Sequence, residues 1–243
     1  MSEQMTPEAY FGNFGPVESV KLTRFQKIVA KTMARNASTV PHVTHHDEVD
    51  VTELEAARRA LPVDSKVSPL IFLIKAVAEA LVAFPRFNAS LSPDGETLIL
   101  KKYVHIGVAV DGPLGLLVPV LRDCDTREVG SIAGELKEVT ALARSKGVPL
   151  DRMEGGCFSI SSLGGIGGHY FTPIINAPEV AILGVTGIRT APVWTGEVFA
   201  PRQLLPLSLS YDHRVINGAD AARFVRQIGQ SLEANGRKDL DKA

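Results

Sequence analysis

The sequence predicts a single α/β domain built around a large mixed β-sheet. Strand-like and helical segments follow one another without the strict alternation that is typical of a purely parallel sheet. The 243 residues are 45% hydrophobic, which is enough for one well-packed core. After residue 20 the chain has no internal repeat, no low-complexity tract and no composition shift that would mark a second domain.

Helical periodicity and terminal signals locate the expected helices. Thr23 and Gln26 form a capping box at the start of the first. Ser68-Pro69 opens a helix that Pro85 ends, and because this helix is apolar nearly all round, we expect it to be central and buried. The predicted helices follow Thr23 and cover 52–61, 68–85, 131–146 and 218–232.

Strand signals fill the intervals between these helices. In the segment 40–51 both sides of an extended chain are partly polar, so we expect a strand that does not face only the core. Asp94-Gly95 predicts a tight turn between two strands. The predicted strands cover 40–51, 87–92, 97–110, 116–121, 157–162, 180–188 and 204–211.

The two ends of the chain differ from its middle. Residues 1–20 are mixed and aperiodic, and we expect an N-terminal arm or linker there. The globular domain is then expected to cover residues 21–234. Residues 235–243 are polar, which predicts a frayed tail after the last helix.

Composition excludes several classes of protein. The chain has 26 basic and 27 acidic side chains, which argues against binding to nucleic acid. Its two cysteines, Cys124 and Cys157, are too few for a disulfide framework and suit a reducing compartment. The most apolar stretch, 70–84, contains Lys75 and Glu79 and is too short to span a membrane. Without a signal-peptide pattern at the start, we expect a soluble cytoplasmic protein.

Three familiar functional motifs are not supported by the sequence. The run Gly164–Gly168 lacks the last glycine of a dinucleotide fingerprint, and no lysine follows it as in a phosphate-binding loop. No serine lies in a G-x-S-x-G elbow. His42, His45 and His46 are close in sequence, but neighbouring strand residues point to opposite faces, so surface or hydrogen-bonded histidines are favoured over a metal site.

The segment 208–218 contains the strongest candidates for chemistry. His213 falls where a buried strand ends and a helix is about to start, a position that holds a side chain at the edge of a sheet. Asn217 is a favoured helix N-cap, with Asp220 at the third helical position. On these residues alone, a structural role for each is the stronger interpretation.

A resemblance to a known family changes that balance. Residues 212–218, Asp-His-Arg-Val-Ile-Asn-Gly, resemble the D-H-R-x-x-D-G signature of the catalytic domains of dihydrolipoamide acyltransferases. These are the core components of 2-oxo-acid dehydrogenase complexes, and the signature links them more loosely to chloramphenicol acetyltransferase. The resemblance covers about residues 15–232, with further similar motifs in the same order at 22–31, 41–44, 115–120, 156–168, 171–174 and 176–179.

The resemblance implies a fold, an activity and partners. The fold is the chloramphenicol acetyltransferase-like two-layer sandwich with a large mixed sheet, assembled as a homotrimer with active sites between subunits. The activity moves an acyl group between dihydrolipoamide and coenzyme A, with the lipoyl group presented by a separate domain and with other 2-oxo-acid dehydrogenase components as partners. A coenzyme A-dependent acyltransferase with another acceptor, and a catalytically weak trimeric scaffold, remain alternatives.

The resemblance also assigns roles to single residues. His213 is implied as the general base on the attacking thiol. A hydroxyl about fifty residues earlier is implied as the oxyanion stabiliser, and it corresponds to Ser161. By strand alternation Ser159 shares the side of Ser161, while Ser162 faces the other way. The sequence assigns no coenzyme A contacts, no metal ligands and no acyl specificity.

Two departures from the family pattern stand out. Asn217 replaces the aspartate of the signature, and an asparagine can hydrogen-bond but cannot form an ion pair. The polar residues 235–243 differ from the apolar ending with which many members join trimers, so we expect a trimer without the larger assembly. No lipoyl domain precedes the catalytic region in this sequence, and an excised domain and a stand-alone relative both remain open.

Overall fold

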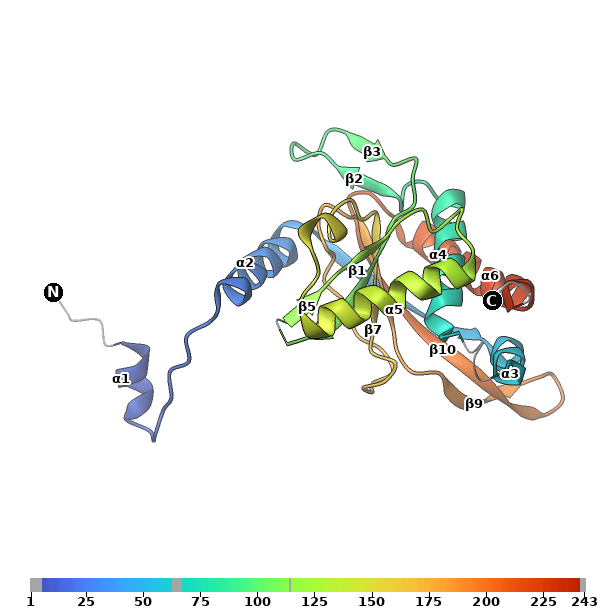
Figure 1. Ribbon diagram of the computed structural model, residues 1–243, viewed down its shortest axis with the longest axis horizontal. Coiled ribbons are helices and arrows are strands. Elements are labelled where there is room, and N and C mark those ends of the chain that lie inside the picture. Colours follow the sequence, from blue (N-terminus) through green and yellow to red (C-terminus); the bar gives the residue numbers. More distant parts are fainter. Residues whose placement is uncertain (1–5, 63–66, 114, 241–243) are drawn as a thin grey trace.

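The computed structural model describes residues 6–62, 67–113 and 115–240, and a mixed β-sheet lies at its centre (Figure 1). The strand order is β1-β10-β8-β7-β4-β5, with β6 beside β4 and β9 beside β10. β8, β7 and β4 run parallel, and the other neighbours in this sheet pair antiparallel. The strands are β1 (His42–Asp50), β4 (Ile106–Gly112), β5 (Gly115–Leu117), β6 (Val120–Leu121), β7 (Phe158–Ser162), β8 (Ala181–Val185), β9 (Arg189–Trp194) and β10 (Phe199–Asp212).

Helices cover one face of this sheet, and the alternation of β7 shows which face it is. Phe158 and Ile160 are fully buried in a core that includes side chains of several helices, whereas Ser159 and Ser161 lie on the opposite face. The helices that contribute to this core are α3 (Thr52–Ala60), α4 (Pro69–Ala83), α5 (Val129–Ser145) and α6 (Gly218–Leu240). Among the described helices, none is both long and apolar enough to cross a membrane.

A cluster of phenylalanines joins the helical layer to the sheet. Phe224 of α6 stacks on Phe87, with ring centroids 4.0 Å apart and planes 5° apart. Its ring also contacts Phe84 at 5.9 Å and Phe158 of β7 at 5.8 Å. One side chain therefore links α6, the end of α4 and the strand that carries Ser161.

The structure confirms the predicted α/β class and most of the helix signals. Thr23 and Gln26 form both bonds of the capping box at the start of α2 (Arg24–Thr39). Ser68 caps α4 by accepting a hydrogen bond from the amide of Leu70, and α4 is buried on most sides, as its uniform hydrophobicity predicts.

The predicted strand 97–110 is wrong, because it is two strands in different sheets. β3 (Leu98–Leu100) pairs with β2 (Ala89–Leu91) in a separate hairpin, and β4 belongs to the main sheet. Between them Asn88 donates its side-chain amide to the carbonyls of Lys101 and Tyr103, which holds the chain as it leaves one sheet for the other.

The predicted strand 116–121 is likewise two pieces, β5 and β6, separated at Pro119. Proline has no N–H to donate to a ladder, although its carbonyl still accepts from the amide of Val108.

A hairpin was missed altogether. β9 pairs with the first residues of β10, which begins at Phe199 rather than near Leu204. Trp194 and Phe199 are 55% and 69% exposed at the tip of this hairpin. In β9 Ala191 is the buried residue, while Pro192 and Trp194 on the exposed side are also nonpolar, so the sequence shows no polar–apolar alternation there.

The two ends of the chain also differ from expectation. Within the expected arm, residues 7–12 form a short helix, α1 (Pro7–Gly12), that Thr6 caps, and residues 6–24 are all exposed. α6 continues to Leu240, beyond the helix end at residue 232 that the sequence predicts. Residues 1–5 and 241–243, at the outer ends of the expected arm and tail, lie outside the described residues.

The phenylalanine cluster predicts a large stability effect. Replacing Phe224 by alanine leaves a cavity against Phe87 and should lower the free energy of unfolding by about 3–5 kcal/mol. Urea denaturation at fixed protein concentration measures this change. Phe199→Ala, at an exposed ring, is the matched control and should change the free energy of unfolding by less than about 1 kcal/mol. Equal losses in both variants would contradict the assignment of Phe224 to the core.

Candidate active site

His213 lies at a sharply fixed corner of the fold. The amide of Asp212 donates to the carbonyl of Val180 in front of β8, and the amide of His213 donates to the carbonyl of Pro41 in front of β1. The end of β10 is thus held on both sides. The His213 side chain is exposed, its ring lies 5.8 Å from that of Tyr211, and within the described chain no group hydrogen-bonds its ring nitrogens.

An ion pair between buried Asp212 and exposed Arg214 stabilises this corner. Asp212 is 2% exposed and accepts hydrogen bonds from the backbone amide and the guanidinium of Arg214, the shortest at 2.7 Å. These hydrogen bonds raise the pKa of Arg214 above its ordinary value. Charge-assisted bonds of this kind are stronger than neutral ones. The backbone on either side of His213 is therefore fixed by its two neighbours.

Asn217 caps α6, as its position after the corner predicts. Its side-chain oxygen accepts from the amide of Asp220 at 2.9 Å, and its side-chain amide donates to the carboxylate of Asp220 at 2.8 Å. This reciprocal pair satisfies a backbone donor of the first turn. The residue that departs from the family signature therefore has a complete structural role within this chain.

Ser161 lies on β7, on the face without helices. It pairs with Ala109 of β4 on one side and with Gly184 of β8 on the other. The ring of Phe171 lies over Gly184, where an added Cβ would come within 2.7 Å of it. Ser161 is half-buried beside this ring, so its hydroxyl is partly shielded from water.

Strand register places Ser161 and His213 far apart within one chain. Gly184 is opposite both Ser161 and Ser208, so Ser161 is level with Ser208, five residues before His213. Five residues along a strand and two strand spacings across the sheet correspond to roughly 20 Å. One chain therefore does not bring these two side chains to the same substrate atom.

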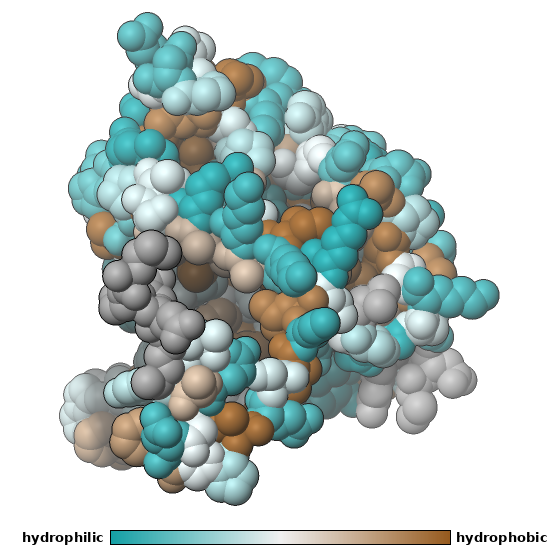
Figure 2. Space-filling view, turned by 90° about the vertical axis from the view of Figure 1, so that its left-hand side faces the viewer, coloured by the Kyte–Doolittle hydropathy of each residue, from teal (hydrophilic) through white to brown (hydrophobic). Residues whose placement is uncertain are grey.

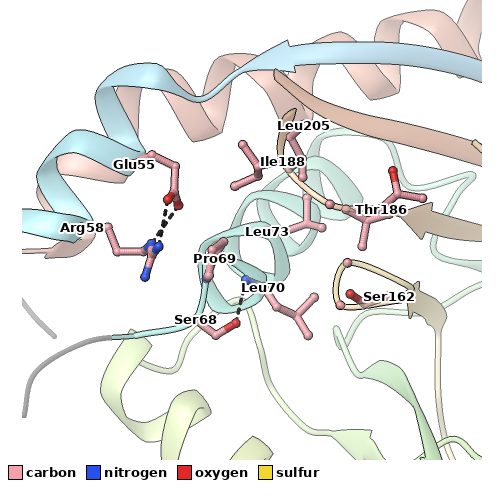
Figure 3. A pocket seen from close by; sticks show the side chains of 14 residues that line it. Glu55, Arg58, Ser68, Pro69, Leu70, Leu73, Ser162, Thr186, Ile188 and Leu205 are labelled. Atoms are coloured by element: carbon pink, nitrogen blue, oxygen red, sulfur yellow. Dashed lines mark hydrogen bonds and ion pairs between the residues drawn. The ribbon is translucent and has the colours of Figure 1, made fainter. Parts of the chain in front are cut away.

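A cavity opens at the end of β7, one residue beyond Ser161. It has a volume of about 310 Å³ and is bordered by Ser162 and Thr186 on one side and by α3 and the start of α4 on the other (Figure 3). Arg58 forms two 2.8 Å hydrogen bonds with the buried carboxylate of Glu55 at its edge. Sequence reasoning missed these residues, because segments more than a hundred residues apart form the walls.

The glycine run after Ser161 forms a turn. Gly167 and Gly168 have positive φ angles of 139° and 82°, which other residues rarely adopt. The carbonyl of Gly164 lies 3.1 Å from where a Cβ on Gly187 would be, so two backbones pass very close there. The glycines thus allow the chain to turn back beside the cavity.

The histidine cluster has hydrogen-bonding roles. His42 bonds the carbonyl of Val40 through Nδ1 and accepts from the amide of Ile175 through Nε2. His46 bonds Ser208 on the neighbouring strand at 2.9 Å and its ring contacts that of Tyr170. The preference for hydrogen-bonded histidines is confirmed at these two positions.

Comparison with known proteins decides the family. Residues 14–237 match the model of the 2-oxoacid dehydrogenases acyltransferase catalytic domain. The chain belongs to this family. Its fold agrees: a solved structure of Azotobacter vinelandii dihydrolipoamide acetyltransferase superimposes with a TM-score of 0.91 at 51% identity, covering 97% of this chain and 98% of that one. A chloramphenicol acetyltransferase structure, 13% identical over 89% of this chain and 99% of that one with a TM-score of 0.57, confirms the two-layer sandwich.

Curated relatives in this acyltransferase family are longer proteins. The chain is 55% identical over 93% of its length to the dihydrolipoyllysine-residue acetyltransferase component of the pyruvate dehydrogenase complex of Cupriavidus necator, and 51% identical over 93% to that of Haemophilus influenzae. It covers 41% of each relative. The chain thus spans about two fifths of the length of these proteins.

The capping geometry of Asn217 gives a prediction. Asn217→Ala removes the acceptor for the amide of Asp220 and should lower the free energy of unfolding by about 1 kcal/mol. Asn217→Asp keeps an acceptor at the helix start and should stay within about 0.5 kcal/mol of the parent. Chemical denaturation of both variants measures the difference. If the alanine variant were as stable as the parent, the capping role would be wrong.

Proposed function

We propose that the protein is a transacylase that moves an acetyl group between dihydrolipoamide and coenzyme A. The acetyl group is supported by the curated relatives, each named as an acetyltransferase component of a pyruvate dehydrogenase complex. The same names support a lipoyl domain and the other components of such a complex as partners. Because both cysteines are free and buried, we also infer a reducing, cytoplasmic location.

One observation carries the proposal. The Azotobacter vinelandii structure was determined to investigate a serine, a histidine and an asparagine in the catalytic mechanism of that enzyme. There the histidine follows the serine by 52 residues and the asparagine follows the histidine by four. Ser161, His213 and Asn217 have the same two spacings. Asparagine at the last position is therefore shared with an acetyltransferase, which argues against the weak-scaffold alternative.

The chemistry proposed for these residues starts with a thiol. A free thiol has a pKa of about 8.5, so only a few per cent is thiolate at neutral pH. The exposed imidazole of His213 accepts the thiol proton as the sulfur attacks the thioester carbonyl, and later returns a proton to the leaving sulfur. The Ser161 hydroxyl donates a hydrogen bond to the oxyanion formed between these two steps. Asn217, through its cap, holds the corner on which His213 lies.

The proposed site lies between chains. Because Ser161 and His213 are roughly 20 Å apart within one chain, a shared thioester needs His213 from one subunit and Ser161 from another. A ring of three subunits closes such a heterologous contact. We therefore propose a homotrimer with three equivalent active sites.

Loss of the Ser161 hydroxyl should reduce turnover. Ser161→Ala removes one oxyanion donor, worth roughly 3 kcal/mol, and should lower kcat on the order of a hundredfold with little change in KM. The measurement is acetyl transfer from acetyl-coenzyme A to dihydrolipoamide, with Ser162→Ala as the matched control. Undiminished turnover in Ser161→Ala would contradict the role of Ser161. Wild-type inactivity with acetyl-, succinyl- and isobutyryl-coenzyme A alike would contradict the proposed function.

Mixed trimers test the position of the site. His213→Ala and Ser161→Ala are each expected to be nearly inactive alone. Unfolded together in equal amounts and refolded, they should recover roughly a quarter of wild-type activity, the share of interfaces that combine an intact His213 with an intact Ser161. Mixing without unfolding is the control. No recovery, in mixed trimers verified by mass spectrometry, would place both residues in one chain.

A further inference from the structure

A buried carboxylate lies on the same face of the sheet as Ser161. Glu179, in the turn before β8, is 6% exposed, and its Oε1 accepts a 3.0 Å hydrogen bond from the hydroxyl of Ser159. Ser159 is 2% exposed and lies two residues before Ser161 on the same strand and the same side. Glu179 is therefore close to the strand position from which Ser161 acts.

The surroundings of Glu179 do not balance a negative charge. Within the described residues its Oε2 has no hydrogen-bond partner, and Glu179 takes part in no ion pair. The cation that influences it is Lys101, but the amino group of Lys101 donates to the carbonyl of Gly156 at 3.4 Å. The other polar groups that influence or face it are Ser159, the neutral amide of Asn176 and the thiol of Cys157.

Burial dominates the titration of this group. It raises the pKa of Glu179 from 4.5 to about 7, against the opposing effects of Ser159, Lys101 and Asn176. Burial also raises the pKa of the Cys157 thiol and lowers the pKa of Lys101. Near neutral pH the carboxyl of Glu179 therefore changes from its neutral form to its charged form. Burial destabilises the charged form.

Glu179 also lies between the strand of Ser161 and the corner that carries His213, which serve two different active sites of the proposed trimer. Through Ser159 it binds the strand of Ser161. Its neighbour Val180 accepts the backbone hydrogen bond of Asp212, which directly precedes His213. A change in the charge of Glu179 thus occurs beside β8, which separates the strand of Ser161 from the strand that ends before His213.

We propose that Glu179 is a positioning residue that must be neutral for Ser161 to stabilise negative charge, so that its ionisation switches the enzyme to a slower form. The proposal rests on the transacylase function proposed above. The oxyanion at Ser161 and a carboxylate at Ser159 are roughly 7–10 Å apart, from two residues of strand rise. With an effective dielectric constant of about 20, their repulsion corresponds to roughly a fifteen- to fiftyfold loss of rate.

The pH profile of kcat is the test. As pH rises through about 7, ionisation of Glu179 should decrease kcat by that fifteen- to fiftyfold factor. In Glu179→Gln, which keeps a neutral side chain of the same shape, the decrease should disappear, with kcat at about pH 6 within threefold of the parent. Glu197→Gln, at an exposed carboxylate of the β9–β10 hairpin, is the matched control and should keep the decrease.

Two neighbouring variants test the same idea if Glu179→Gln does not fold. Ser159→Ala and Lys101→Gln each remove a group that favours the charged form of Glu179. Each should raise the pKa of Glu179 and move the decrease to higher pH. A decrease that persists in Glu179→Gln, a folded Glu179→Gln without activity at any pH, or an unmoved decrease in both neighbouring variants would overturn the proposal.

Protein stability gives a readout that is independent of catalysis. The folded pKa of Glu179 lies above its ordinary value, so the stability that its neutral form contributes is complete below about pH 4.5 and is lost as pH rises through about 7. The free energy of unfolding of the wild type should therefore fall over that range relative to Glu179→Gln. If the wild type shows this fall in the free energy of unfolding but has no acyl-transfer activity, the transacylase function alone is refuted. If the free energy of unfolding has the same pH dependence in the wild type and in Glu179→Gln, the titration of Glu179 is refuted.

Discussion

The last nine residues of β10 are hydrogen-bonded to β1, and five of them are also hydrogen-bonded to β8 on the other side. This double pairing determines the register of the strand that ends at Asp212, and register determines which side chains face the helices. Leu207, Leu209 and Tyr211 face the core, while Ser208 and Ser210 face away from it. A slip of one residue would bury the hydroxyls among the helices and expose the leucines.

That two-sided sheet explains where chemistry can occur. The core face is occupied by α3–α6, so substrate can reach only the opposite face or the strand ends. Ser161 lies on the opposite face and His213 at a strand end, and the same register that makes both positions rigid also keeps them apart. Because the rigid sheet cannot bring one residue to the other, a complete site forms only when a second copy of the chain supplies the missing group.

The face of the molecule seen from the N-terminal side has a hollow with apolar surface along it (Figure 2). The exposed Tyr10, Phe11 and Phe14 of the N-terminal segment add further apolar surface outside the core.

The sequence predicts structural features that depend on residues close together in the chain. It does not predict features that depend on contacts between distant residues. The cap at Thr23, the start of α4 at Ser68 and the cap at Asn217 each depend on residues three or four positions apart, which a sequence displays directly. The break in the strand 97–110 depends on a hydrogen bond from Asn88 to Lys101, thirteen residues later. In the hairpin beyond Val185, the exposed side of β9 is as nonpolar as its partly buried side, so no alternation is visible in the sequence. Motif resemblance indicated Ser161 and His213, but neither spacing nor periodicity could reveal that Glu179 lies beside Ser159. That contact joins positions twenty residues apart through the sheet.

Close packing on the same sheet requires glycine at several positions. On the face of Ser161, Gly184 leaves room for the ring of Phe171, and Gly107 leaves room for Val118 and the hydroxyl of Ser159. Gly156 leaves room for the carboxylate of Glu179, whose oxygen lies 3.0 Å from where a Cβ would be. At Gly184 and Gly107 an added methyl group would come within 2.8 Å of the covering side chain, closer than carbon atoms approach without displacement. Glycine at these places keeps the covering groups close to the sheet, so that this face is partly shielded from water beside Ser161. These glycines therefore determine how closely other side chains pack around the serines of β7.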